Sequence, residues 1–151
     1  ILGSGNPAIQ NDCLSLAAEM PDRVHVEIRY DANFSRKMYA AGDMLLMPSR
    51  YEPCGIAQMI AMLYGCVPIA HATGGLKDTV EPYNEFENTG SGFSFSNYNG
   101  DELLNTVNYS KSVCFDSKTN WNKMVARDME KDYSWTNSKG NYEELYNYLI
   151  G

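Results

Sequence analysis

Short apolar runs separated by amphipathic stretches dominate the hydrophobic pattern of this chain. The runs at residues 44–47 and 66–70 are continuous, which is typical of strands covered on both faces of a parallel sheet. Residues 1–2, 24–28 and 93–95 predict three further short strands. Helical spacing of apolar residues predicts helices at residues 7–20, 33–41, 56–64, 76–80, 101–109, 120–132 and 142–149.

Strands that alternate with helices along the chain indicate a parallel sheet. The pattern therefore predicts an α/β fold with a doubly wound parallel sheet and helices on both faces. With 151 residues, the chain has the length of a single domain with its own core. The last helix carries an apolar stripe, Tyr142, Leu145, Tyr146 and Leu149, which we expect to pack in the core or between domains.

The junction between residues 44–47 and the helix at 56–64 carries the most informative chemistry. Glu52 stands there, followed by Pro53 at an expected first helical position, where the missing N–H has no cost. The N–H groups of Cys54, Gly55 and Ile56 would then point out of the start of the helix, where they favour anions and hydroxyl oxygens. Ligands of open α/β sheets bind at this end of a strand, so the sequence predicts an acid beside a set of donors.

Charge and cysteine usage narrow the function further. A net charge of -7 argues against binding to nucleic acid or to an anionic membrane, because there is no basic excess to neutralise phosphates. The four cysteines form no metal-binding spacing, and we interpret them as reduced thiols, with no metal site. No membrane-length apolar run or signal peptide is visible. Because the chain opens on an expected strand, we expect an N-terminally truncated fragment of a longer enzyme.

Several candidate residues also have ordinary structural explanations. Glu52 could cap a helix, and Tyr30 could be an aromatic residue at the end of a strand. His71 ends a strand, where a lone histidine is more often part of a hydrogen-bonded structure than a catalyst, although a place at the rim of a site stays open. Gly74 and Gly75 are expected to permit a close backbone approach or a positive φ.

A family resemblance rests on motifs that agree in order and spacing over nearly the whole chain. They are ILGSG at 1–5, YDANF at 30–34, GDMLLMPS at 42–49, YEPCGIAQM at 51–59, YGCVP at 64–68, ATGGLKDTV at 72–80, GSGF at 90–93 and DYSW at 132–135. Together they resemble the C-terminal domain of bacterial glycogen synthase and plant starch synthase.

This resemblance implies a retaining glycosyltransferase of the GT-B fold, of which residues 1–151 would be a single nucleotide-sugar-binding, Rossmann-like domain. The full-length enzyme would transfer glucose from ADP-glucose or UDP-glucose to the non-reducing end of an α-1,4-glucan, in the cytoplasm or in a plastid. The glucan would bind through an N-terminal domain outside this chain, so the isolated fragment is expected to be inactive. No cofactor is expected besides the donor substrate. The alternatives are a catalytically silent nucleotide-sugar or glucan-binding module and another retaining GT-B transferase.

The resemblance also assigns roles to residues. Glu52 would be the catalytic carboxyl group that faces the glucosyl ring, and Tyr30 would lie against the nucleotide base. From the residues themselves we expect Glu52 to work in ionised form rather than as a general acid, because the N–H donors around it favour the charged form. The other substrate-binding residues implied are Cys54, Gly55, Ile56, Gly74 and Gly75. Ile60 stands where many retaining GT-B enzymes have a second glutamate, which supports the glycogen and starch synthase branch. Ala57 stands where relatives often carry a hydroxyl or amide side chain.

Overall fold

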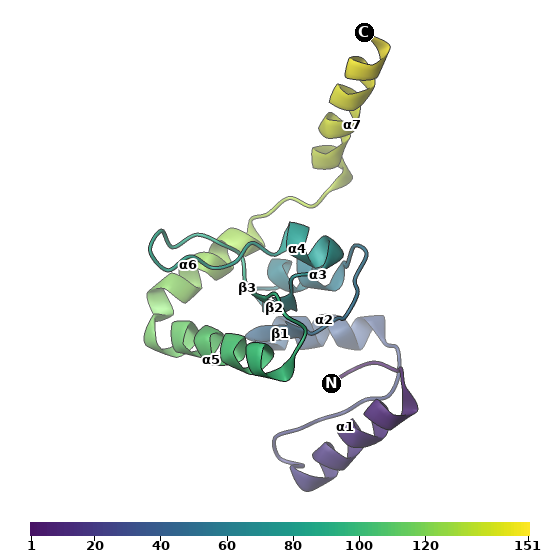
Figure 1. Cartoon of the computed structure of the whole chain (residues 1–151), viewed down its shortest axis with the longest axis vertical. Coiled ribbons are helices and arrows are strands. Elements are labelled where there is room, and N and C mark those ends of the chain that lie inside the picture. The colour runs from purple at the N-terminus through teal and green to yellow at the C-terminus, as the bar shows by residue number, and fades with distance from the viewer. The chain divides into compact units, whose positions relative to one another are not determined.

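The computed structural model describes residues 1–151, except for the side chain of Asn141. The chain forms two compact units, Ile1–Met38 and Tyr39–Gly151, and helix α2 (Ala32–Ala41) contains the boundary between them. Figure 1 shows the elements of both units. None of the helices among the described residues combines the length and the apolar character that crossing a bilayer requires.

The first unit contains helix α1 (Pro7–Glu19), which confirms the predicted helix to within one residue. Asn6 caps it by accepting a hydrogen bond from the N–H of Ala8. The two strands expected in this unit reduce to one parallel bridge between Leu2 and Glu27. Three bonds hold this pairing: Gly3 N–H donates to Glu27 O, Glu27 N–H donates to Ile1 O, and the terminal ammonium of Ile1 donates to His25 O.

The second unit is built on a three-stranded parallel sheet. Its strands are β1 (Met44–Met47), β2 (Val67–His71) and β3 (Phe93–Phe95), in the order β1-β2-β3. Met44 pairs with Val67, and Ile69 pairs with Phe93. Because all three strands run in the same direction, their carboxyl ends meet at one edge of the sheet. The α/β class and the three predicted strands of this unit are therefore confirmed.

Helices connect and follow these strands. They are α3 (Ala57–Leu63), α4 (Gly74–Thr79), α5 (Gly100–Asp116), α6 (Lys118–Met129) and α7 (Trp135–Ile150). α5 continues well beyond the predicted end at residue 109, because Val113 and Cys114 extend its buried face by another turn. α7 begins earlier than predicted, since Ser134 caps its start by accepting a hydrogen bond from Asn137 N–H.

The two faces of β2 are packed by different helices. Val67 and Ile69 join a cluster with residues of α5 and α6, including Val113, Trp121 and Met124. On the opposite face Ala70 packs with Leu76 and Val80, at α4. Figure 1 shows helices flanking the strands in this unit. Every residue of β2 is buried, and each large apolar side chain in such a position contributes about 1.5–3 kcal/mol.

One expectation about burial is wrong, and one of the two alternatives for the apolar stripe of α7 is excluded. We expect β1 to be covered on both faces, but Leu46 is 51% exposed, so one face of β1 is open at this position; β1 is also an edge strand of the sheet. The apolar stripe of α7 does not join the core, since each of its four side chains is at least half exposed. Packing of this stripe between domains stays a prediction.

Candidate functional site

The segment that joins β1 to α3, residues 48–56, carries the predicted acid, and we name it the Glu52 loop. β1 ends at Met47, so the loop starts at the carboxyl end of the sheet, as predicted. The side chain of Glu52 is half-buried and is therefore not sealed in the core. The Ser49 hydroxyl lies 3.4 Å from Glu52 Oε2 and donates to it. This contact orients the carboxylate while leaving its second oxygen available.

The helix after this loop starts later than predicted. α3 begins at Ala57 with Ile56 as its N-cap, so Pro53 is not its first residue. The reason is Gly55, whose φ of 73° is left-handed and cannot belong to a right-handed helix. The donors expected at the helix start therefore lie on the loop. Among the residues that the structure describes, the N–H groups of Cys54, Gly55 and Ile56 have no hydrogen-bond acceptor.

Two glycines at the start of α4 hold the Glu52 loop through its backbone. A Cβ atom at Gly74 would lie 2.0 Å from the carbonyl oxygen of Glu52, and one at Gly75 would lie 2.0 Å from that of Cys54. Gly74 also has a positive φ of 46°. The N–H of Gly75 donates to the Glu52 carbonyl at 3.1 Å. The predicted close approach and positive φ are thus confirmed, and the backbone that these glycines approach is that of the Glu52 loop.

His71 links the carboxyl ends of the outer strands. It is the last residue of β2 and only 9% exposed. Its Nδ1 lies 2.8 Å from the carbonyl oxygen of Ser49, and its Nε2 lies 3.2 Å from that of Ser96. The ring also packs against Phe95 and Tyr98, at centroid distances of 5.4 and 5.2 Å. The expected hydrogen-bonded structural role is confirmed, and it anchors the residue that contacts Glu52.

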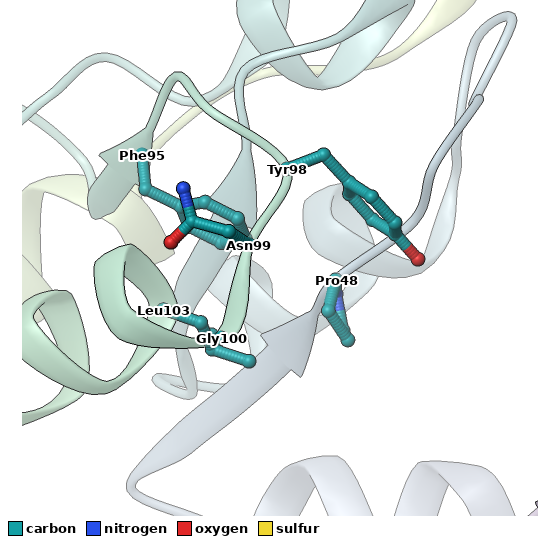
Figure 2. A pocket seen from close by; sticks show the side chains of 6 residues that line it. All are labelled: Pro48, Phe95, Tyr98, Asn99, Gly100 and Leu103. Atoms are coloured by element: carbon teal, nitrogen blue, oxygen red, sulfur yellow. The ribbon is translucent and has the colours of Figure 1, made fainter.

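A pocket of about 300 Å³ opens at the same edge of the sheet. Its lining, shown in Figure 2, consists of Pro48, Phe95, Tyr98, Asn99, Gly100 and Leu103. Pro48 follows β1, whereas the other lining residues lie in β3, in the start of α5 or in the loop between them. None of the predicted site residues lines this pocket.

The charge beside this pocket is negative. Glu102, in the first turn of α5, accepts hydrogen bonds from the side chain and backbone of Asn97 and from the N–H of Ser96. These bonds, the one from the Asn97 side chain foremost, lower the pKa of Glu102 below its usual value. An ionised carboxylate at this place repels phosphates, so the pocket suits an uncharged group.

Tyr30 lies in the first unit, and its side chain is 90% exposed. Asp31 follows it and accepts from the N–H groups of Asn33 and Phe34, at the start of α2. The bond from Phe34 N–H is the main reason why the pKa of Asp31 is lowered. Glu52, Cys54, Gly55, Ile56, Gly74 and Gly75 share the second unit. The part of Tyr30 in the site stays a prediction.

Gln58 is the site residue that the sequence reasoning missed. Its side chain is fully buried, and its amide nitrogen contacts the carbonyls of Cys54 and Gly55. The signal was present in the sequence, because Gln58 is the one amide in the otherwise apolar segment 56–64. A buried amide must find hydrogen-bond partners, so a lone glutamine of this kind indicates a specific polar contact.

Comparison with known proteins shows the family of this chain. The model of the family described as "Glycosyl transferases group 1" matches residues 1–112. The glycogen synthase of Lachnospira eligens is 51% identical over 149 residues, which are 99% of this chain and 31% of that protein. The glycogen synthase of Lachnoclostridium phytofermentans is 48% identical with the same coverage. The chain thus spans about a third of the length of these relatives.

Solved structures agree with the sequence comparison. The catalytic domain of starch synthase IV from Arabidopsis thaliana, bound to ADP and acarbose, matches with a TM-score of 0.83 and 33% identity. That match covers 96% of this chain and 30% of the other. Sucrose-phosphate synthase from Thermosynechococcus elongatus shares the fold at a TM-score of 0.67, with 24% identity, 99% coverage of this chain and 37% of the other. The resemblance predicted from the motifs is confirmed, and the chain belongs to the group 1 glycosyltransferases.

Proposed function

We propose that this chain is the donor-binding, C-terminal domain of a glycogen or starch synthase. The full-length enzyme transfers glucose from ADP-glucose or UDP-glucose to the non-reducing end of an α-1,4-glucan, with retention at the anomeric carbon. The glucan binds to an N-terminal domain outside this chain, and the donor is a substrate, so that no cofactor takes part. The reaction takes place in the cytoplasm, or in the plastid in a plant.

In this proposal Glu52 acts in its ionised form. Glucosyl transfer develops positive charge on the sugar ring and negative charge on the departing diphosphate. The carboxylate of Glu52, oriented by the Ser49 hydroxyl, stabilises the positive charge and accepts hydrogen bonds from sugar hydroxyls. The N–H groups of Cys54, Gly55 and Ile56 donate to diphosphate or hydroxyl oxygens, since no protein group among the described residues occupies them. Tyr30 lies against the base.

The observation that carries the proposal is the construction of the Glu52 loop. Its backbone is held against Gly74 and Gly75 so closely that neither position has room for a side chain. This packing presents a half-buried acid and three unoccupied N–H donors together at the carboxyl end of a parallel sheet, where ligands of such folds bind. Further support comes from the identity with glycogen synthases over 99% of the chain and from the ADP in the starch synthase IV structure.

Steady-state kinetics of the full-length protein test the proposal, with labelled ADP-glucose or UDP-glucose as donor and glycogen as primer. We expect incorporation of glucose by the parent protein. Glu52→Gln removes the charge without changing the shape, and it should lower kcat about 10²–10³-fold, the usual loss for one preorganised electrostatic contact. Glu130→Gln is the matched control, because Glu130 is an exposed acid at the end of α6. The kcat of this variant should equal that of the parent protein.

Near-normal kcat in the Glu52→Gln variant would contradict the role of this carboxylate. A parent protein that binds ADP-glucose in calorimetry but transfers no glucose would instead be a silent binding module. Turnover with the same donors onto an acceptor other than glucan would identify a different retaining transferase. Either of the last two results would replace the proposed function, whereas the first would remove only the role of Glu52.

A further inference from the structure

Gln58 connects three segments that meet beside the candidate site. It belongs to α3 and is 0% exposed. Its amide nitrogen lies 2.9 Å from Thr79 Oγ1 in α4, 3.0 Å from the carbonyl oxygen of Gly55 and 3.3 Å from that of Cys54. An amide NH₂ has two hydrogens, which are shared among these three acceptors. One side chain therefore joins the Glu52 loop to both neighbouring helices.

The orientation of this amide follows from the hydrogen-bond directions. The Thr79 hydroxyl donates its only hydrogen to the carbonyl of Gly75, 2.6 Å away. Thr79 can therefore only accept from Gln58, and the two loop carbonyls can only accept as well. All three neighbours require the nitrogen, so the amide oxygen is left buried with no partner among the described residues. The fold retains an unsatisfied polar atom in order to keep this contact, although buried polar atoms are normally paired.

Gly55 provides the space for the amide. A Cβ atom at Gly55 would lie 2.7 Å from the Gln58 amide oxygen and 2.9 Å from its nitrogen. The loop thus rests on the Gln58 amide on one side and on Gly74 and Gly75 on another. Since Thr79 binds Gly75, the two supports form one connected set of hydrogen bonds.

We propose that Gln58 and Thr79 are positioning residues, which hold the Glu52 loop in the geometry that transfer requires. This inference rests on the proposed function, because it assumes that Glu52 acts on the donor. A displacement of about 1 Å of a reacting group can cost about 10²-fold in rate. Loss of the amide donors leaves the carbonyls of Cys54 and Gly55 without their partner, and the loop then moves to find new ones.

The test uses four variants of the full-length protein. Gln58→Met keeps the length and apolar volume but removes the donors, and Thr79→Val removes the hydroxyl while keeping the shape. Thr79→Ser keeps the hydroxyl and serves as the conservative variant. Ser110→Ala is the matched control, because Ser110 is a fully buried hydroxyl in α5 that bonds the Val107 carbonyl, away from the loop.

We expect Gln58→Met and Thr79→Val each to lower kcat about 10-fold to 100-fold. The KM for the nucleotide-sugar donor should rise together with the loss in kcat, because the N–H groups of Cys54, Gly55 and Ile56 lie on the loop that moves. Thr79→Ser should keep most of the activity, and Ser110→Ala should match the parent. Combining Gln58→Met with Thr79→Val should give much less than the product of the two losses, since both residues belong to one network.

Hydrogen exchange of the backbone provides a readout that is independent of activity. In Gln58→Met and in Thr79→Val, exchange should accelerate at the N–H of Gly75, which donates to the carbonyl of Glu52 and therefore reports on the hold of the Glu52 loop; we call this the loop exchange. Exchange in the sheet should stay at the parent rate. If Gln58→Met does not fold, Thr79→Val alone tests the positioning role, because valine fills the same volume as threonine.

The outcomes separate the two proposals. Activity of the parent together with unchanged kcat and unchanged loop exchange in the variants would overturn the positioning role and leave the proposed function intact. Exchange that accelerates over the whole chain would also overturn it, since the residues would then support the fold in general. If the parent transfers no glucose, the proposed function fails, and loop exchange alone decides whether Gln58 and Thr79 hold the loop.

Discussion

Asp128 is a buried carboxylate, and its replacement by asparagine makes a strong test of the packing of α6. Its side chain is 1% exposed, and Lys131 Nζ lies 3.1 Å from its Oδ1. The Oδ2 atom has no hydrogen-bond partner in the described part of the chain. Asp128→Asn keeps the shape and removes the charge, so it isolates the cost of burying that charge.

The magnitude follows from the pKa. Burial raises the pKa of Asp128 from its ordinary value of 3.8 to about 6, although Lys131 acts in the opposite direction. Between these two pH values the folded chain binds a proton that the unfolded chain has released, so the free energy of unfolding falls as the pH rises. Each pKa unit corresponds to about 1.4 kcal/mol, and the whole loss is therefore about 3 kcal/mol. It is absent below about pH 3 and complete above about pH 7.

The assay is urea unfolding at several pH values from 4 to 7, followed by the fluorescence of Trp121. This tryptophan is 2% exposed and lies in α6, on the same helix as Asp128. The stability of Asp128→Asn relative to the parent should improve by about 2 kcal/mol between pH 4 and pH 7, because this window excludes the part of the loss that occurs below pH 4. The pKa of about 6 already includes the opposing effect of Lys131, which is itself partly exposed.

Asp132→Asn is the matched control, because the pKa of Asp132 is shifted in the opposite direction from that of Asp128. A hydrogen bond from Ser134 lowers the pKa of Asp132, so this carboxylate stabilises the fold at neutral pH and loses that effect as the pH falls. Its replacement should therefore become less favourable, relative to the parent, as the pH rises. A stability difference for Asp128→Asn that stays constant from pH 4 to pH 7 would refute the reasoning.

The remaining predictions concern the site and the thiols. Gly75→Ala places a Cβ atom 2.0 Å from the Cys54 carbonyl oxygen, so the Glu52 loop must move. We expect kcat of the full-length protein to fall at least about 10²-fold. Parent-like kinetics would contradict the close approach. Burial raises the pKa of the Cys66 thiol to about 11. At pH 8 a maleimide should therefore label the exposed Cys54 and leave the buried Cys66 unmodified until urea is added. Peptide mass spectrometry measures the labelling of each thiol. Labelling of both thiols at equal rates would show that Cys66 is accessible.

Local patterns in the sequence were sufficient for the fold class and for the position of the acid. The apolar runs at 44–47 and 93–95 became β1 and β3 with the predicted bounds, because short apolar runs are typical of strands in a parallel sheet, although β1 is only partly buried. The motifs placed Glu52 after a strand of that sheet. They also assigned Glu52, Gly74 and Gly75 to the same site. A strand, a helix and a motif can each be recognised from residues that lie close together in the chain. The sequence shows such local patterns directly.

The sequence by itself therefore determined that the chain has an α/β fold, belongs to the group 1 glycosyltransferases and carries an acid at the end of a strand. Only the tertiary structure decided how that acid is held. The left-handed backbone at Gly55 moved the start of α3 to Ala57, and the amide of Gln58 found Thr79, which lies 21 residues away in the chain. Such contacts depend on distances between segments that are remote in sequence, and periodicity carries no information about those distances.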